Sequence, residues 1–252
     1  TWAPREYPEL FWGVPEPGQP CHLNLARRDA QDWLIEMLSD WIRRLDLRWS
    51  RYDYNIGPAP YWHAADRSGR VQFDYVAGLY RVLDELRERH PRWMIENCSS
   101  GGRRIDLGTI ARTHTHWFSD HTSCPSVCRW MQLRSAQFLP GNCPNSSVAI
   151  QKGAGDPEDI DGAVRSRMMG KLAFDGDIAS LSDRATERCR HWVDVYKRHR
   201  HLLVGNFRQL SSIPTAPDEW DIARFSSPDE GEGLLAAFRP TGEDGAWPFP
   251  PP

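Results

Sequence analysis

The chain has 252 residues, with 31 Lys and Arg against 34 Asp and Glu, a net charge of −3, and 40% hydrophobic residues. This balance gives no basic footprint for nucleic acid, and no apolar run approaches the roughly 20 residues that span a bilayer, so neither nucleic acid nor a membrane is an expected partner. Six cysteines are too sparse for a disulfide scaffold and lack zinc-ribbon spacing, so no metal is expected.

Short apolar segments alternate with amphipathic segments along the chain. This rhythm predicts α/β architecture with a parallel sheet built from βα units. Strands are expected at residues 23–26, 47–53, 93–97, 116–119, 137–139 and 172–174. Helices are expected at residues 30–45, 75–86, 105–111, 127–133, 164–169 and 184–201. Residues 141–161 form a looser stretch between the last two strands of this series.

The composition changes at Asn206, where turn residues separate two runs at residues 220–225 and 234–238. Such runs between Gly, Pro and Ser predict β-strands. We therefore expect residues 1–205 to form the α/β domain and residues 206–252 to begin a second domain made of strands.

A glycine-rich turn at residues 96–106 (Glu-Asn-Cys-Ser-Ser-Gly-Gly-Arg-Arg-Ile-Asp) joins a predicted strand to a predicted helix. Small residues leave the backbone accessible, and such turns are where α/β folds bind ligands. The predicted strands before and after this turn in the sequence end in acids, Asp53 and Asp120. Because the carboxyl ends of parallel strands meet at one edge, we expect the two acids and the turn to form one site.

Three segments in this order carry a resemblance to a known family: residues 51–55 (Arg-Tyr-Asp-Tyr-Asn), the turn at 96–106, and residues 117–120 (Trp-Phe-Ser-Asp). The chain resembles the melibiases, the α-galactosidases of glycoside hydrolase family 36, from about residue 20 to about residue 240. The resemblance implies a (β/α)8 TIM barrel followed by a C-terminal β-sandwich. It further implies that this chain is incomplete at both ends, a partial barrel without the first strands, which in the family carry an acidic pair that binds galactose.

The resemblance also implies an activity and roles for the two acids. Terminal α-galactosidic bonds in oligosaccharides would be cleaved with retention, by a double displacement between two carboxylates. Asp53 would be the nucleophile, and Asp120 the acid/base, its pKa raised by Trp117, Phe118 and the charge of Asp53. No cofactor is implied, the oligosaccharide is the expected partner, and a homo-oligomer of the full-length protein is left open.

A substrate-binding set around these acids follows from the same resemblance. Arg51 lies two residues before Asp53, on the same strand face, where its charge would keep the nucleophile ionised. Trp117 would offer a flat ring to a sugar face. The complete expected set is Arg27, Arg51, Asn55, Cys98, Gly101, Gly102 and Trp117.

Departures from the family pattern leave alternatives open. Arg51 replaces the usual Lys, Asn24 replaces an Asp, and Ser123 replaces the second acid after Asp120. One alternative is an α-glycosidase or transglycosylase of different sugar specificity, and another is a catalytically silent, truncated carbohydrate-binding fragment. The first six residues lack the apolar core of a signal peptide, so a cytoplasmic location is favoured.

Overall fold

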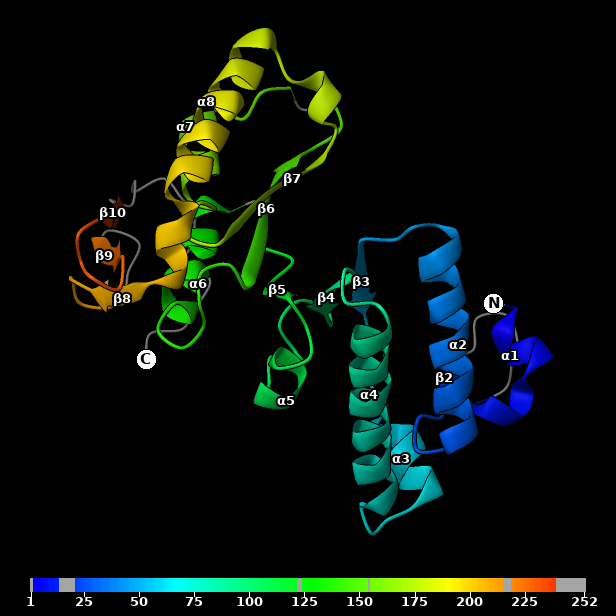
Figure 1. Cartoon of the computed structure of the whole chain (residues 1–252). Helices are drawn as coiled ribbons and strands as arrows, with labels where there is room; N and C mark the ends of the chain where they lie inside the picture. Colours follow the sequence, from blue (N-terminus) through cyan, green and yellow to red (C-terminus); the bar gives the residue numbers. More distant parts are fainter. Residues whose placement is uncertain (1, 14–20, 122–123, 154, 215–218, 239–252) are drawn as a thin grey trace. The chain divides into compact units, whose positions relative to one another are not determined.

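The computed structural model describes residues 2–13, 21–121, 124–153, 155–214 and 219–238. The chain divides into two compact units, residues 1–114 and 115–252, which are described separately (Figure 1). The helices of the first unit are α1 (Ala3–Glu6), η1 (Pro8–Leu10), α2 (Arg28–Arg44), α3 (Ala59–Ala65), α4 (Arg70–Arg89) and α5 (Leu107–Ile110). Its strands are β1 (Phe11–Trp12), β2 (His22–Leu23), β3 (Trp49–Asp53) and β4 (Met94–Cys98).

In the described part of the second unit, strands and helices again alternate, and three further strands follow them. Its helices are α6 (Pro125–Ser135), α7 (Ile160–Arg165), η2 (Ile178–Ser180), α8 (Asp183–His199) and η3 (Arg200–Val204). Its strands are β5 (Thr115–Trp117), β6 (Pro144–Ile150), β7 (Lys171–Gly176), β8 (Asn206–Gln209), β9 (Asp221–Ser226) and β10 (Gly233–Phe238). Among the helices in these described residues, none has both the length and the apolar character needed to pass through a bilayer.

The first unit is built around the parallel pair β3 and β4, which α3 and α4 connect. Helices α2 and α4 lie side by side (Figure 1) and bury apolar side chains between them, including Ile35 and Leu83. Helix α4 also comes close to the segment before α2, because a Cβ atom on Gly78 would lie 1.9 Å from the Leu25 carbonyl oxygen. A side chain at position 78 would therefore push α4 away from its neighbour.

The second unit combines two sheets. Strands β5, β6 and β7 are parallel, with α6 and α7 in the connections between them. Strands β8, β9 and β10 form an antiparallel sheet with β9 in the middle. Both sheets contribute to one apolar core, in which Val148 of β6 lies in the same cluster as Phe225 of β9.

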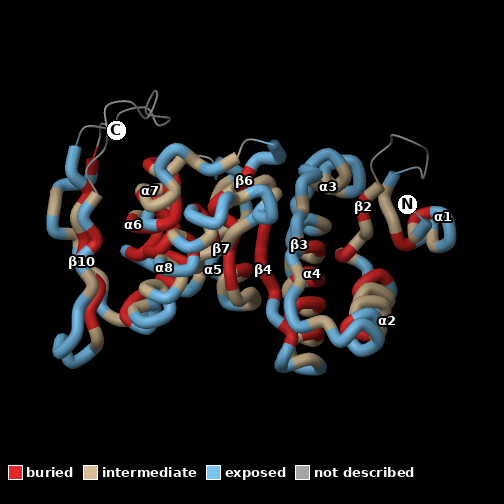
Figure 2. Tube along the Cα trace, turned by 90° about the horizontal axis from the view of Figure 1, so that it is seen from above, coloured by how far each residue is buried: buried red, intermediate tan, exposed pale blue. Residues whose placement is uncertain are grey.

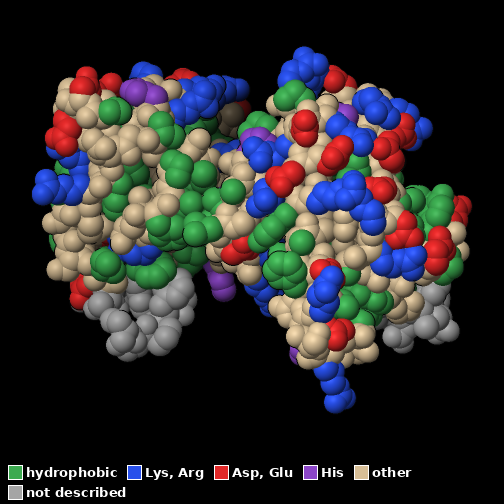
Figure 3. Space-filling view, turned by 60° about the horizontal axis from the view of Figure 1, so that its bottom comes forward, with side chains coloured by type: hydrophobic (Ala, Val, Ile, Leu, Met, Phe, Trp, Pro, Cys, Tyr) green, Lys and Arg blue, Asp and Glu red, His purple; other side chains and the backbone are tan. Residues whose placement is uncertain are grey.

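Burial differs sharply between the two strands of the first unit. Strand β4 is buried from its second residue onward, whereas the residues of β3 are exposed or half-buried (Figure 2). Trp49 and Met94, which face each other across the pair, are 43% and 41% exposed. Figure 3 shows apolar side chains scattered among charged ones on one face of the molecule. On β3, the face that carries Trp49, Arg51 and Asp53 is therefore exposed, whereas Glu96 and Cys98 on the same face of β4 are buried.

Two predicted strands were wrong. Residues 137–139 form the turn that ends α6, where the backbone N–H of Phe138 and of Leu139 both donate to the Ser135 carbonyl. Of residues 23–26, only Leu23 is in a strand, and β2 pairs antiparallel with β1 in a separate two-stranded sheet. The sequence analysis also missed α1, β1, α3, β6 and β8, whereas the other predicted strands and helices overlap observed ones. The domain boundary expected between residues 205 and 206 stays a prediction, and residues 239–252 lie outside the described residues.

Candidate active site

The candidate site in the first unit is built on the register of β3 against β4. Arg51 lies opposite Glu96, and Asp53 lies opposite Cys98. Because side chains alternate along a strand, these four side chains share one face of the sheet. Asp53 and Cys98 are the last residues of their strands. This is the edge at which parallel α/β folds place catalytic groups.

Arg51 is held by a carboxylate to which the sequence analysis assigned no role. Its Nε donates to Glu96 Oε1 at 2.6 Å, and Glu96 is fully buried, with 0% of its side chain exposed. A buried carboxylate needs a charged or hydrogen-bonding partner. In the sequence, an acid directly after the apolar run of a predicted strand, two residues before Cys98, could have indicated that Glu96 needs a partner, but not that the partner is Arg51.

Cys98 is a protonated thiol next to the Asp53 carboxyl group. The pKa of the Cys98 thiol is raised to about 11, chiefly by burial and also by the nearby Asp53, against the opposing effects of a hydrogen bond from the Gly101 N–H and of the charge of Arg51. At neutral pH the thiol therefore keeps its proton and is a weak hydrogen-bond donor. It is suited to a polar contact with a hydroxyl group rather than to attack on a substrate.

The glycine turn is closed by backbone hydrogen bonds. The Ser99 N–H donates to the Gly101 carbonyl at 3.0 Å, and Gly101 has a φ of +81°, in the left-handed region that favours glycine. Asn55 links this turn to the segment after β3, because its Oδ1 accepts from the Ser100 N–H at 2.7 Å and from Ser100 Oγ at 3.1 Å. The side-chain oxygen of Asn55 is thus hydrogen-bonded, whereas its side-chain nitrogen takes no part in this link.

Arg27 lies at the start of α2, where its contacts are local. Its Nε and Nη2 donate to the two carboxylate oxygens of Asp29 at 3.0 and 2.5 Å, and its Nη1 donates to the Glu9 carbonyl at 2.9 Å. These bonds fix the entry to α2. The role of Arg27 in substrate binding stays a prediction.

The second unit holds the other predicted acid. The indole Nε1 of Trp117 donates to Asp120 Oδ1 at 2.9 Å, so the buried Trp117, at the end of β5, holds the exposed Asp120 just beyond the strand. This contact gives Trp117 a positioning role, in addition to the sugar stacking that stays a prediction. Ser123 lies outside the described residues. The assignment of Asp53 and Asp120 to one site also stays a prediction, since they belong to different units.

The Arg51–Glu96 pair leads to a prediction about stability. Arg51→Met should lower the free energy of unfolding by about 3 kcal/mol, because it removes the charged partner of a buried carboxylate while Arg51 itself is 35% exposed. Adding Glu96→Gln should recover part of this loss, since a neutral amide needs no counter-charge. Urea unfolding measures both variants. Arg48→Met, which removes an exposed pair with Asp46, is the matched control and should change little. Equal losses in Arg51→Met and Arg48→Met would contradict the importance of the pair.

Comparison with known proteins shows which family the chain resembles. Residues 18–205 match the Melibiase family. α-Galactosidase AgaA of Geobacillus stearothermophilus is 28% identical over 262 residues, which cover 96% of this chain and 34% of AgaA. α-Galactosidase C of Emericella nidulans is 35% identical over 222 residues, which cover 86% of this chain and 28% of that protein. The chain thus spans about a third of the length of the curated relatives it matches.

Solved structures give the same result for the fold. The crystal structure of AgaA, described as a GH36 α-galactosidase, superposes with a TM-score of 0.78 at 26% identity, over 98% of this chain and 35% of AgaA. A variant of AgaA has been solved in complex with raffinose, with a TM-score of 0.76 at 25% identity. The α/β fold expected from the sequence, part of a (β/α)8 barrel followed by the start of a β-sandwich, is confirmed.

Proposed function

Because the chain belongs to the Melibiase family, we propose that it forms part of a retaining α-galactosidase that removes terminal α-galactosyl groups from oligosaccharides. The observation that carries the proposal is the placement of Asp53 at the end of β3, across from Cys98 and beside the closed glycine turn. The relatives AgaA and α-galactosidase C are named for the same activity.

In the proposed mechanism, Asp53 is the nucleophile and Asp120 is the acid/base. Asp53 attacks the anomeric carbon and forms a covalent galactosyl-enzyme, while Asp120 gives its proton to the leaving oxygen. Asp120 then takes a proton from water, which attacks the same carbon and releases galactose with its configuration retained. This route requires the two carboxyl groups to lie about 5–5.5 Å apart. The hydrogen bond from Trp117 holds one oxygen of Asp120 and leaves the other for the leaving group.

The residues around Asp53 would bind the sugar that it attacks. The Cys98 thiol, the side-chain nitrogen of Asn55 and the backbone of Gly101 and Gly102 offer polar groups beside the nucleophile, and Arg51 adds a positive charge on the same face of the sheet. Since a raffinose complex is known for an AgaA variant, galactosides of the raffinose type are the proposed substrates. We propose a cytoplasmic location and no cofactor.

A panel of nitrophenyl α-glycosides tests the proposed specificity. We expect α-galactoside to be cleaved with a kcat/KM at least about 100-fold above that of the α-glucoside and α-mannoside, since a site built to hydrogen-bond one hydroxyl arrangement rejects others strongly. Highest turnover on another α-glycoside would favour the alternative of a different sugar specificity. Binding of galactose without turnover of any member would favour a silent carbohydrate-binding protein.

A further inference from the structure

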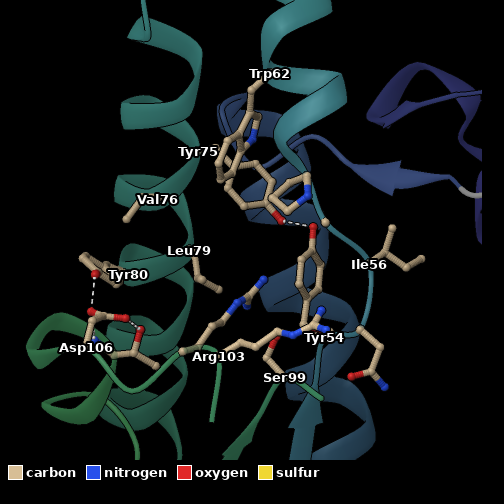
Figure 4. Close-up of a pocket in the computed structure, with 15 residues that line it drawn as sticks. Tyr54, Ile56, Trp62, Tyr75, Val76, Leu79, Tyr80, Ser99, Arg103 and Asp106 are labelled. Carbon is tan, nitrogen blue, oxygen red and sulfur yellow. Dashed lines mark hydrogen bonds between the residues drawn. The ribbon is translucent and has the colours of Figure 1, made fainter. Parts of the chain in front are cut away.

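A cavity of about 280 Å³ lies in the first unit beyond the ends of β3 and β4, and it shares Asn55 with the candidate active site (Figure 4). Its walls come from the segments after β3 and β4, from α3 and from one side of α4. Four aromatic side chains line it, those of Tyr54, Trp62, Tyr75 and Tyr80, together with aliphatic ones such as Leu79. This volume is just below the usual range of about 300–1,000 Å³ for ligand pockets, so it suits a ligand with a single ring.

The cavity lies on the opposite side of β3 from the candidate nucleophile. Tyr52 is on the face of β3 opposite to Asp53, because side chains alternate along the strand. The rings of Tyr52 and Tyr54 stack at 6.3 Å between centroids with an angle of 13°, so Tyr54 lies on that same side. A ligand in this cavity would therefore not occupy the space in front of Asp53.

Two guanidinium groups give the cavity its charge. Arg104 stacks on the Tyr54 ring, with its Cζ atom 3.7 Å from the ring centroid, and its buried Nη1 has no hydrogen-bond partner among the described residues. Arg103 also lines the cavity, and Figure 4 shows it reaching into the space between α4 and Tyr54. Within the described part of the chain, neither arginine forms a salt bridge.

The acid in the cavity wall is already engaged elsewhere. Asp106 caps α5, where its carboxylate accepts from the Thr109 N–H at 3.0 Å and from Thr109 Oγ1 at 2.8 Å. It also accepts from the Tyr80 hydroxyl at 3.0 Å. The two guanidinium groups thus have no carboxylate fixed against them, and a buried N–H without a partner costs free energy unless a ligand accepts its hydrogen bond.

The aromatic wall is held in place by a chain of hydrogen bonds. The Tyr75 hydroxyl donates to the Tyr54 hydroxyl at 3.0 Å, and Tyr54 in turn contacts His22 Nδ1 at 2.5 Å. Burial and the charge of Arg104 lower the pKa of His22, so the ring is neutral at pH 7 and can accept from Tyr54. A wall fixed in this way loses little conformational freedom when a ligand binds.

We propose that this cavity is a second binding site, which takes a sugar-sized ring carrying a carboxylate or a phosphate group. The planar guanidinium forks of Arg103 and Arg104 match the oxygen geometry of such anions. The aromatic rings cover the apolar face of the sugar. Neutral galactose would lack the group that the arginines recognise.

Isothermal titration of the Asp53→Asn protein tests this proposal, because that variant lacks the proposed nucleophile. Galactose is kept at saturation to occupy the candidate active site, and the probes are galacturonate, galactose 6-phosphate and inorganic phosphate. We expect at least one acidic sugar to bind, and more tightly than inorganic phosphate. The stronger of the two sugars identifies the anion as a carboxylate or a phosphate.

Two variants test whether the acidic sugar binds in this cavity. Arg103→Gln should weaken binding of the acidic sugar by about 10-fold or more, since it removes charge-assisted hydrogen bonds. Arg92→Gln removes another exposed arginine of the first unit and should leave binding unchanged. Absence of binding, binding of phosphate as tight as that of the sugars, or equal effects of the two variants would overturn the proposal. None of these results depends on α-galactosidase activity, so failure of the proposed function would be seen separately, in the nitrophenyl assay.

Discussion

Replacing Asp53 with alanine or glycine is expected to lower the kcat for α-galactosides by about 10⁴-fold or more, because no group remains to form the covalent intermediate. Sodium azide should restore part of the activity by attacking the anomeric carbon from the space that the carboxylate vacates, and its product should be the β-galactosyl azide. The assay uses an activated nitrophenyl α-galactoside with and without azide.

A control variant separates this effect from a general loss of charge. Asp40→Ala removes an exposed carboxylate of α2 that pairs with Arg44, and it should leave both kcat and the response to azide unchanged. Turnover by Asp53→Ala at the rate of the unchanged protein would rule out Asp53 as the nucleophile.

Replacing Asp120 is expected to separate substrates by their leaving groups. Asp120→Ala should slow the cleavage of raffinose by about 10²- to 10⁴-fold, because a sugar alkoxide needs a proton in order to leave. The first step with a dinitrophenyl galactoside should be nearly unaffected, since that phenolate leaves without a proton. Pre-steady-state release of the phenolate measures this first step.

A variant of Trp117, which donates a hydrogen bond to Asp120, is the matched comparison for Asp120→Ala. Trp117→Phe keeps an aromatic ring but removes the Nε1–H that donates to Asp120, so it should give a smaller loss with the same dependence on the leaving group. Equal losses of Asp120→Ala on raffinose and on the dinitrophenyl substrate would contradict an acid/base role and indicate that Asp120 positions the sugar.

Much of the fold could be predicted because the apolar patterns are clear. Strands β3 and β4 and helices α2 and α8 each lie within or close to a predicted range. Strand β6 was missed because its first half is polar: Asn145, Ser146 and Ser147 are buried in it. Their burial depends on partners distant in the sequence, such as Arg167, which donates to the Ser147 carbonyl. A pattern of hydrophobicity carries no signal for such long-range hydrogen bonds.

Proline and turn residues explain two other differences. Helix α3 begins directly after Pro58 and contains Pro60, which are typical of a loop but are also tolerated in the first turn of a helix. The apolar pair Phe138 and Leu139 resembles a short strand, yet both residues continue the turn at the end of α6. In each case local composition allows two structures, and the packing of the whole unit selects one.

The residues around Asp53 could be predicted better than their contacts. The motif led to Arg51, Asn55, Cys98 and Gly101, and the structure places Arg51 within β3, Cys98 at the end of β4, and Asn55 and Gly101 in the segments that follow the two strands. The pair between Arg51 and Glu96 depends on the register of two strands, which the sequence alone does not reveal.

Trapping of the covalent intermediate tests the central claim most directly. The protein is incubated with a 2-deoxy-2-fluoro-α-galactosyl substrate that carries an activated leaving group, digested, and analysed by mass spectrometry of its peptides. The proposed mechanism predicts one fluorogalactosyl group on the peptide that contains Asp53, attached to its side-chain carboxylate. A label on a different carboxylate, or turnover of the substrate with no covalent adduct and inverted galactose as the product, would contradict it.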